Sequence, residues 1–226
     1  MQGVAVLIAA AQGLVMRRVL LLRRCGCRGA AERLYRRCAL ALSVLMLGAM
    51  LTQEVILWRA GLLTWRTGLP LHLCSAVGLV LPAALMTRRR ALWHAALYLG
   101  LPGGLMATLF PSILPTPYPY LTRLSFHALH GCLLTAPLLP LCMGERPSPR
   151  GALQAGLFLT ALAVIAALVN RLTGSNYLFL NLPASGTPLD WLARGGLAAY
   201  RVKLAGIAAA VLAAEAGGWG IMNDES

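Results

Sequence analysis

Seven apolar segments separated by short polar connections make up most of the chain. They lie near residues 4–22, 36–58, 69–87, 91–109, 121–142, 151–172 and 197–217. A transmembrane helix needs about 20 consecutive apolar residues, and these segments approach that length. Segment 4–22 is the weakest because Arg17 and Arg18 interrupt it, but it lacks the features of a signal peptide. The pattern predicts an all-α, polytopic membrane helix bundle of about seven transmembrane helices, or six if the first segment does not cross.

Composition agrees with a membrane protein. Of the 226 residues, 58% are apolar and only 12% are charged, and the mean hydropathy is +0.70. So few charged side chains cannot cover the surface of a soluble domain of this length. No internal repeat or linker divides the chain, so residues 1–226 are predicted to form a single integral membrane domain.

The positive charge lies in the connections between the apolar segments. The net charge is +13, but the arginines do not follow an amphipathic face or alternate with aromatic residues, so we expect no nucleic-acid partner. Cytoplasmic loops of membrane proteins are rich in arginine and lysine. Eleven of the 20 basic residues fall at the first, third and fifth connections, and Arg17 and Arg18, which precede the first connection, raise the number on that side to 13. This asymmetry predicts an N-out, C-in topology.

Polar residues inside the apolar segments gather near their predicted outer ends. Intramembrane polar groups are functional candidates by default, because lipid does not solvate them. The inner halves of the segments carry few such residues, so the pattern predicts one polar pocket that opens outward. Its candidate members are Glu54, His72, Cys74, His127, His130 and Asn170.

Cys74 and a histidine of another helix form the candidate reactive pair. Pro70 is predicted to occupy the first turn of its helix, which puts Cys74 in the second turn, near the positive end of the helix dipole. His72 points to a different side of that helix. In the 121–142 segment, His127 and His130 share one helix face, and His130 lies at a depth comparable to that of Cys74. A Cys74–His130 pair would suit acyl transfer through a thiolate.

Other interpretations of these residues remain open. A cysteine in an apolar segment is often only a small buried side chain, and a transmembrane histidine often only bonds a neighbouring helix. His72, His127, His130 and Glu54 could also bind zinc, although no metalloprotease motif supports this. A proton path needs polar groups in the inner halves, where few are seen. We expect no cofactor and no metal.

Three motifs resemble a known family. They are LPLHLCS at 69–75, FHALHG at 126–131 and NRLTGSNYLFL at 170–180. Together they look like the YwaF family of bacterial membrane proteins, which is similar to the eukaryotic transmembrane protein 164 family. The likeness covers a core of about residues 36–215. His127 departs from the pattern, as an additional histidine one turn before His130.

The resemblance implies a six- or seven-helix membrane fold in the cell membrane, here a multi-pass protein of a bacterial inner membrane. For the eukaryotic relatives it also implies phospholipid acyltransferase chemistry through an intramembrane cysteine and histidine, which correspond to Cys74 and His130. We therefore expect an acyltransferase or acyl-ester hydrolase that acts on membrane lipids. The alternative is a non-enzymatic protein that binds or transports a lipid or small molecule through the same pocket. The expected substrate-binding residues are Glu54, His72, His127, Asn170, Asn176 and Tyr177.

Overall fold

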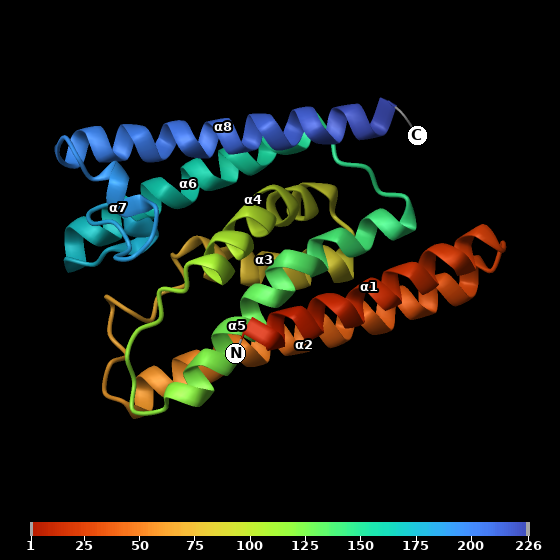
Figure 1. The fold of residues 1–226 in the computed structure, drawn as a ribbon, viewed down its shortest axis with the longest axis horizontal. Helices are drawn as coiled ribbons and strands as arrows, with labels where there is room; N and C mark the ends of the chain where they lie inside the picture. The colour runs from red at the N-terminus through yellow and green to blue at the C-terminus, as the bar shows by residue number, and fades with distance from the viewer. Residues whose placement is uncertain (1, 225–226) are drawn as a thin grey trace.

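The computed structural model describes residues 2–224, and these residues form helices and connections without a strand (Figure 1). This confirms the all-α prediction. The α-helices are α1 (Gln2–Arg24), α2 (Arg28–Arg59), α3 (Leu73–Thr87), α4 (Arg90–Leu109), α5 (Pro119–Thr135), α6 (Pro149–Thr173), α7 (Leu189–Leu192) and α8 (Gly196–Asp224). Two 3₁₀ helices, η1 (Ala136–Met143) and η2 (Tyr177–Phe179), follow α5 and α6.

Each predicted apolar segment corresponds to a helix, and four of the described helical stretches have the length and apolar composition to cross a membrane. They are 28–59, 119–143, 149–173 and 196–221, and α3 is a shorter apolar helix. The protein is therefore a helical bundle of the membrane type. The count of seven crossings and the N-out, C-in topology stay predictions.

The fifth segment changes its helix type at residue 135. Pro137 and Pro140 supply no backbone N–H for an α-helical ladder, and a proline ring clashes with the preceding turn. The chain continues beyond Thr135 as the tighter 3₁₀ helix η1, which ends at Gly144 with a positive φ of 89°. The predicted continuous helix 121–142 is thus an α-helix followed by a 3₁₀ helix.

The connections collect at two ends of the bundle. What we call the arginine end holds the connections α1–α2, α3–α4 and η1–α6, toward the right in Figure 1. The loop end holds the connections 60–72, 110–118 and 174–188, toward the left. Contacts confirm both groups, because Glu32 bonds Arg88 across the first end and Arg66 bonds the Thr173 carbonyl across the second.

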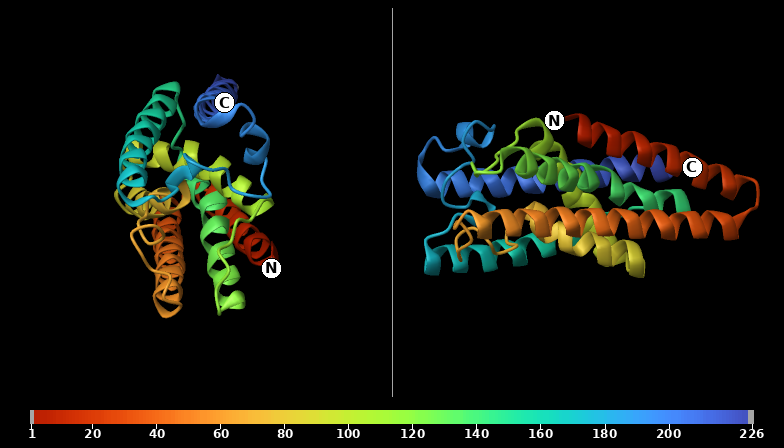
Figure 2. Two further views of the ribbon diagram at one scale, coloured as in Figure 1. Left: turned by 90° about the vertical axis from the view of Figure 1, so that its left-hand side faces the viewer. Right: turned by 90° about the horizontal axis from the view of Figure 1, so that it is seen from below.

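The main core lies among α2, α3, α4 and α5, while α6 and α8 pack on one side of it (Figure 2). Close helix approach depends on glycine: a Cβ at Gly104 would lie 3.1 Å from the Leu134 backbone nitrogen. Large apolar side chains on the outer faces of α6 and α8, such as Leu157, Val164 and Val202, are exposed. Such faces suit contact with lipid rather than water.

Candidate functional site

Asn170 organises the turn that follows α6. Its side chain is 97% buried, and Oδ1 accepts hydrogen bonds from the Tyr177 backbone N–H at 2.7 Å and the Ser175 hydroxyl at 2.9 Å. Its Nδ2 donates to the Tyr177 carbonyl at 3.0 Å. Asn170 therefore uses both its amide oxygen and its amide nitrogen to hold Tyr177 in place.

The Tyr177 phenol then connects this turn to the segment before α3. Its hydroxyl donates to the Trp65 carbonyl and accepts from the Leu69 N–H, both at 3.0 Å. Burial raises the pKa of the Tyr177 phenol, so the hydroxyl keeps the proton that it donates. Two motifs that lie 100 residues apart in the sequence are thereby joined, and Asn170 and Tyr177 position the chain that leads to Cys74.

Asn176 acts within the same turn. Its Oδ1 accepts from the N–H groups of Asn181 and Leu182, and its Nδ2 donates to the Leu182 carbonyl at 2.9 Å. Like Asn170, Asn176 therefore stabilises the turn in which it lies. The structure thus gives both asparagines and Tyr177 intramolecular partners at the loop end, where the sequence led us to expect a substrate mouth.

Helix α3 begins later than the sequence suggested. It starts at Leu73, with His72 as its N-cap residue in an extended conformation, so Pro70 lies before the helix and Cys74 lies in its first turn. The prediction that Pro70 occupies the first turn is wrong. The reason is the long-range bond from the Leu69 N–H to Tyr177, which holds residues 69–72 in a connection.

His72 and Cys74 point toward different elements. The imidazole of His72 packs against the rings of Tyr177 and Phe179, with both ring centroids 5.2 Å away. Cys74 instead faces α4, where a Cβ at Gly103 would lie 3.8 Å from its sulfur. His72 is therefore part of the contact between the two joined motifs and is no partner for the thiol.

His130 approaches α4 from the other side. A Cβ at Gly104 would lie 3.2 Å from the His130 carbonyl oxygen, so the backbone of α5 at His130 packs closely on α4. Cys74 and the backbone of His130 therefore both lie next to α4. Both α3 and α5 pack closely on α4.

The imidazole of His130 is held in one tautomer. It is 95% buried, and its Nδ1 lies 2.7 Å from the Phe126 carbonyl oxygen, with the Phe126 ring centroid 4.0 Å away. A carbonyl oxygen only accepts hydrogen bonds, so Nδ1 carries the proton. The lone pair is then on Nε2, which is the nitrogen available to act as a base.

His127 and Glu54 take other positions. His127 is buried, and its Nδ1 has no hydrogen-bond partner among the described residues. A Cβ at Gly68 would lie 3.4 Å from Glu54 Oε2, and Glu54 lies within electrostatic range of Tyr177. Glu54 therefore belongs to the loop-end contact around Tyr177.

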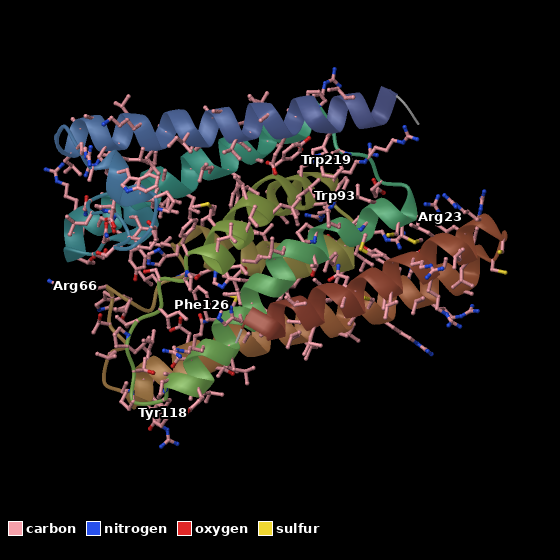
Figure 3. All side chains as sticks on the ribbon, in the orientation of Figure 1. Arg23, Arg66, Trp93, Tyr118, Phe126 and Trp219 are labelled. Carbon is pink, nitrogen blue, oxygen red and sulfur yellow. The ribbon has the colours of Figure 1, made fainter. Side chains whose placement is uncertain are left out.

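A second polar cluster, missed in the sequence, lies nearer the arginine end. His94 of α4 is 95% buried and its Nδ1 lies 3.1 Å from Gln154 Oε1 of α6, while Glu215 of α8 lies within electrostatic range of Tyr98. Within residues 2–224, His94 Nε2 and Glu215 Oε2 are buried atoms without a hydrogen-bond partner. Figure 3 shows the neighbouring Trp93 and Trp219 where α4 meets α8.

The expectation that the inner halves carry few polar groups is therefore wrong. The cluster was missed because each helix contributes only one or two polar residues, and helix packing alone brings them together. A signal was present, since His94 lies within the predicted segment 91–109 and Glu215 is an isolated acid in segment 197–217. A charged side chain inside an apolar segment is a functional candidate whatever its depth.

No metal-ligand cluster supports the zinc interpretation. Among the residues described, no three His, Cys, Asp or Glu side chains lie close enough together to hold a metal ion. His72 packs on Tyr177, and His130 Nδ1 is bonded to the Phe126 carbonyl, so two of the proposed ligands are directed elsewhere.

Comparison with known proteins connects these residues to a family. A model of the TMEM164 family matches residues 3–214. A protein of Treponema pallidum (strain Nichols), described only as an uncharacterized protein, is 34% identical over 148 residues. That match covers 64% of this chain and 59% of the length of the Treponema protein. No solved structure matches.

Proposed function

The chain belongs to the TMEM164 family, and we propose that it is an integral membrane enzyme that moves an acyl group from a membrane lipid. Cys74 is the nucleophile and His130 the general base, and the reaction is acyl transfer or hydrolysis of an acyl ester. The observation that supports the proposal is the buried His130 imidazole, whose Nδ1 bond to the Phe126 carbonyl leaves Nε2 as a base, together with Cys74 in the first turn of α3.

The reaction has two balanced steps. His130 Nε2 takes the proton of the Cys74 thiol as the sulfur attacks the ester carbonyl, and the same proton goes to the lipid alcohol that leaves. The acyl group is then a thioester on Cys74. An acceptor alcohol, or water, gives its proton to Nε2 and attacks the thioester, and the returned proton restores the thiol.

The position of Cys74 in the first turn of α3 favours this chemistry. The first N–H groups of an α-helix have no partner within the helix, and His72 makes no side-chain cap bond to them. These groups and the helix dipole stabilise negative charge on the sulfur or on the oxygen of the attacked carbonyl. The apolar surroundings of Cys74 oppose a free thiolate, so proton transfer and attack occur together once the ester is bound.

The other expected site residues serve the site indirectly in this proposal. Tyr177, which Asn170 holds in place, sets the position of residues 69–74. Asn176 stabilises the loop that follows Tyr177, and His72 packs between the two motifs. Glu54 lies within electrostatic range of Tyr177. His127 has an unpartnered ring nitrogen and is the polar residue left to bind the lipid or a water. We place the protein in the cell membrane of a bacterium, with membrane lipids as its substrates.

The test is acyl transfer by the purified protein in phospholipid nanodiscs. We expect Cys74→Ser and His130→Gln to abolish transfer of a labelled acyl chain to an added lysophospholipid or water. Cys38→Ser is the matched control, because Cys38 is also half-buried against the main core. Full activity in Cys74→Ser contradicts the mechanism.

A non-enzymatic binder or transporter is the second candidate function. The observation in its favour is the cluster of His94, Gln154 and Glu215, which supplies polar groups where a transport path requires them. In that case Cys74 only packs. No thioester then forms on Cys74 when the protein is incubated with phospholipid, whereas the enzyme carries the acyl group there.

A further inference from the structure

We propose that the arginine end binds the phosphate group of an anionic membrane phospholipid, on Arg88 and Arg90. These side chains stand at the rim of a shallow hollow that is lined by Tyr35, Arg88, Arg90, Trp93, Met143 and Glu145, among others. The hollow lies at the opposite end of the bundle from the loop-end contact of Tyr177. The proposal does not depend on the activity of Cys74.

Arg88 is fixed from two sides. Its Nη2 lies 2.6 Å from Glu32 Oε2, and its guanidinium carbon lies 4.3 Å from the centre of the Tyr35 ring. Tyr35 is itself buried and donates a hydrogen bond to the Leu85 carbonyl at 3.1 Å. A guanidinium held in this way over an aromatic ring loses little freedom when an anion binds.

The backbone of Arg88 adds an independent observation. Arg88 is the C-cap residue of α3 and has a left-handed conformation with φ 55° and ψ 25°. Glycine and asparagine adopt this conformation at low cost, whereas an arginine there is unusual and carries some strain. Such strain is typical of positions where the side chain has a task, and here the conformation accompanies a guanidinium at the rim of the hollow.

Arg90 completes the rim. Its Nε lies 3.0 Å from Glu145 Oε2, and its side chain is 66% exposed. A guanidinium has five N–H donors, so the bond to one glutamate leaves donors for phosphate oxygens. The two glutamates hold the arginines in position, and the exposure of Arg90 leaves its remaining donors accessible to a headgroup.

The lining of the hollow favours a lipid over a free phosphate. Trp93 and Met143 also line it, and the buried indole of Trp93 donates its N–H to the Pro137 carbonyl at 2.8 Å. Apolar side chains therefore lie next to the cationic groups, which matches a phosphodiester attached to glycerol and acyl chains. Basic pockets between helices on the cytoplasmic side of membrane proteins suit anionic headgroups in this way.

Thermal unfolding in detergent tests the proposal. We expect phosphatidylglycerol to raise the unfolding temperature more than phosphatidylcholine with the same acyl chains. Arg88→Gln/Arg90→Gln removes that difference. Arg24→Gln/Arg37→Gln is the control of equal charge, because both arginines are exposed at the arginine end and do not line the hollow. Arg90→Gln alone weakens the apparent affinity by about tenfold, as expected for one charge-assisted contact.

Each other outcome overturns the proposal. If the two double variants lose the phosphatidylglycerol effect equally, the attraction is diffuse electrostatics. If glycerol 3-phosphate without lipid gives the same stabilisation, the ligand is a soluble phosphate. If the unaltered protein does not distinguish the two lipids, no such site exists. If Arg88→Gln/Arg90→Gln does not fold, the single variant Arg90→Gln decides between these outcomes, because the exposed Arg90 side chain contributes little to packing.

Discussion

The two ends of the bundle are held together by different chemistry. At the loop end, hydrogen bonds that involve no ion pair form these connections: Asn170 holds Tyr177, Tyr177 holds Trp65 and Leu69, and Arg66 donates to the Thr173 carbonyl. At the arginine end, the connections are ion pairs that involve Glu32 and Glu145, whose side chains are 30% and 31% exposed. Exposed ion pairs give little stability, whereas buried hydrogen bonds are costly to break.

The difference agrees with the proposed roles of the two ends. A nucleophile next to an apolar lipid must be held in position, and the buried hydrogen bonds of Asn170 and Tyr177 do this for the chain that leads to Cys74. A site for a headgroup phosphate needs accessible cations, and the arginine end supplies them. The comparison can be tested by substitutions at both ends.

The largest expected effect is the loss of activity in His130→Gln. The variant lacks a basic nitrogen to accept the Cys74 proton, so we expect acyl transfer to fall by about 10²–10⁴-fold. The rate of labelled-acyl transfer in nanodiscs measures it. His94→Gln, at the second cluster, serves as the comparison. An equal loss of acyl transfer in His94→Gln would contradict the assignment of His130 as the base.

Next in size is the loss of stability in Asn170→Ala. This change removes three hydrogen bonds and leaves the buried Tyr177 N–H unpaired, so we expect a loss of about 2–4 kcal/mol in the free energy of unfolding. Asn181→Ala is the control in the same loop and is only half-buried. Denaturation in detergent compares them, and equal stabilities would contradict the role of Asn170.

Substitution by alanine should change the stability differently at the neighbouring glycines Gly103 and Gly104 of α4. A Cβ at Gly104 would lie 3.1–3.2 Å from the α5 backbone, so we expect Gly104→Ala to destabilise by about 1–3 kcal/mol through overpacking. At Gly103 the nearest atoms would be 3.4–3.8 Å away, an ordinary contact. Gly103→Ala should therefore be tolerated, and the same measurement shows whether the two variants differ.

The smallest expected effect is at the arginine end. Glu145→Gln removes an exposed ion pair with Arg90, so we expect the stability to fall by less than about 1 kcal/mol. The unfolding temperature of this variant should stay close to that of the unaltered protein at high salt, where exposed pairs are screened. A loss as large as that in Asn170→Ala would contradict the contrast between the two ends.

The sequence predicted the helices well because long apolar runs determine them. It failed where a distant contact decides the local structure: the start of α3 at Leu73 depends on Tyr177, more than 100 residues away. The 3₁₀ helix after Thr135 was only partly predictable, from Pro137 and Pro140.

For the candidate site, sequence motifs selected the residues but did not predict their contacts. Cys74 and His130 could be selected from the pattern, while the tasks of Asn170 and Asn176 in closing their loop appear only in the fold. The cluster of His94 and Glu215 was missed because it is assembled from single polar residues on separate helices.

The central claim is that Cys74 carries the acyl group between donor and acceptor. Its most direct test is mass spectrometry of the purified protein after brief incubation with phospholipid and acid quenching. We predict an acyl adduct on the peptide that contains Cys74, absent in Cys74→Ser and sensitive to hydroxylamine as a thioester is. Acyl transfer without an adduct on Cys74, or undiminished transfer in Cys74→Ser, would contradict the account.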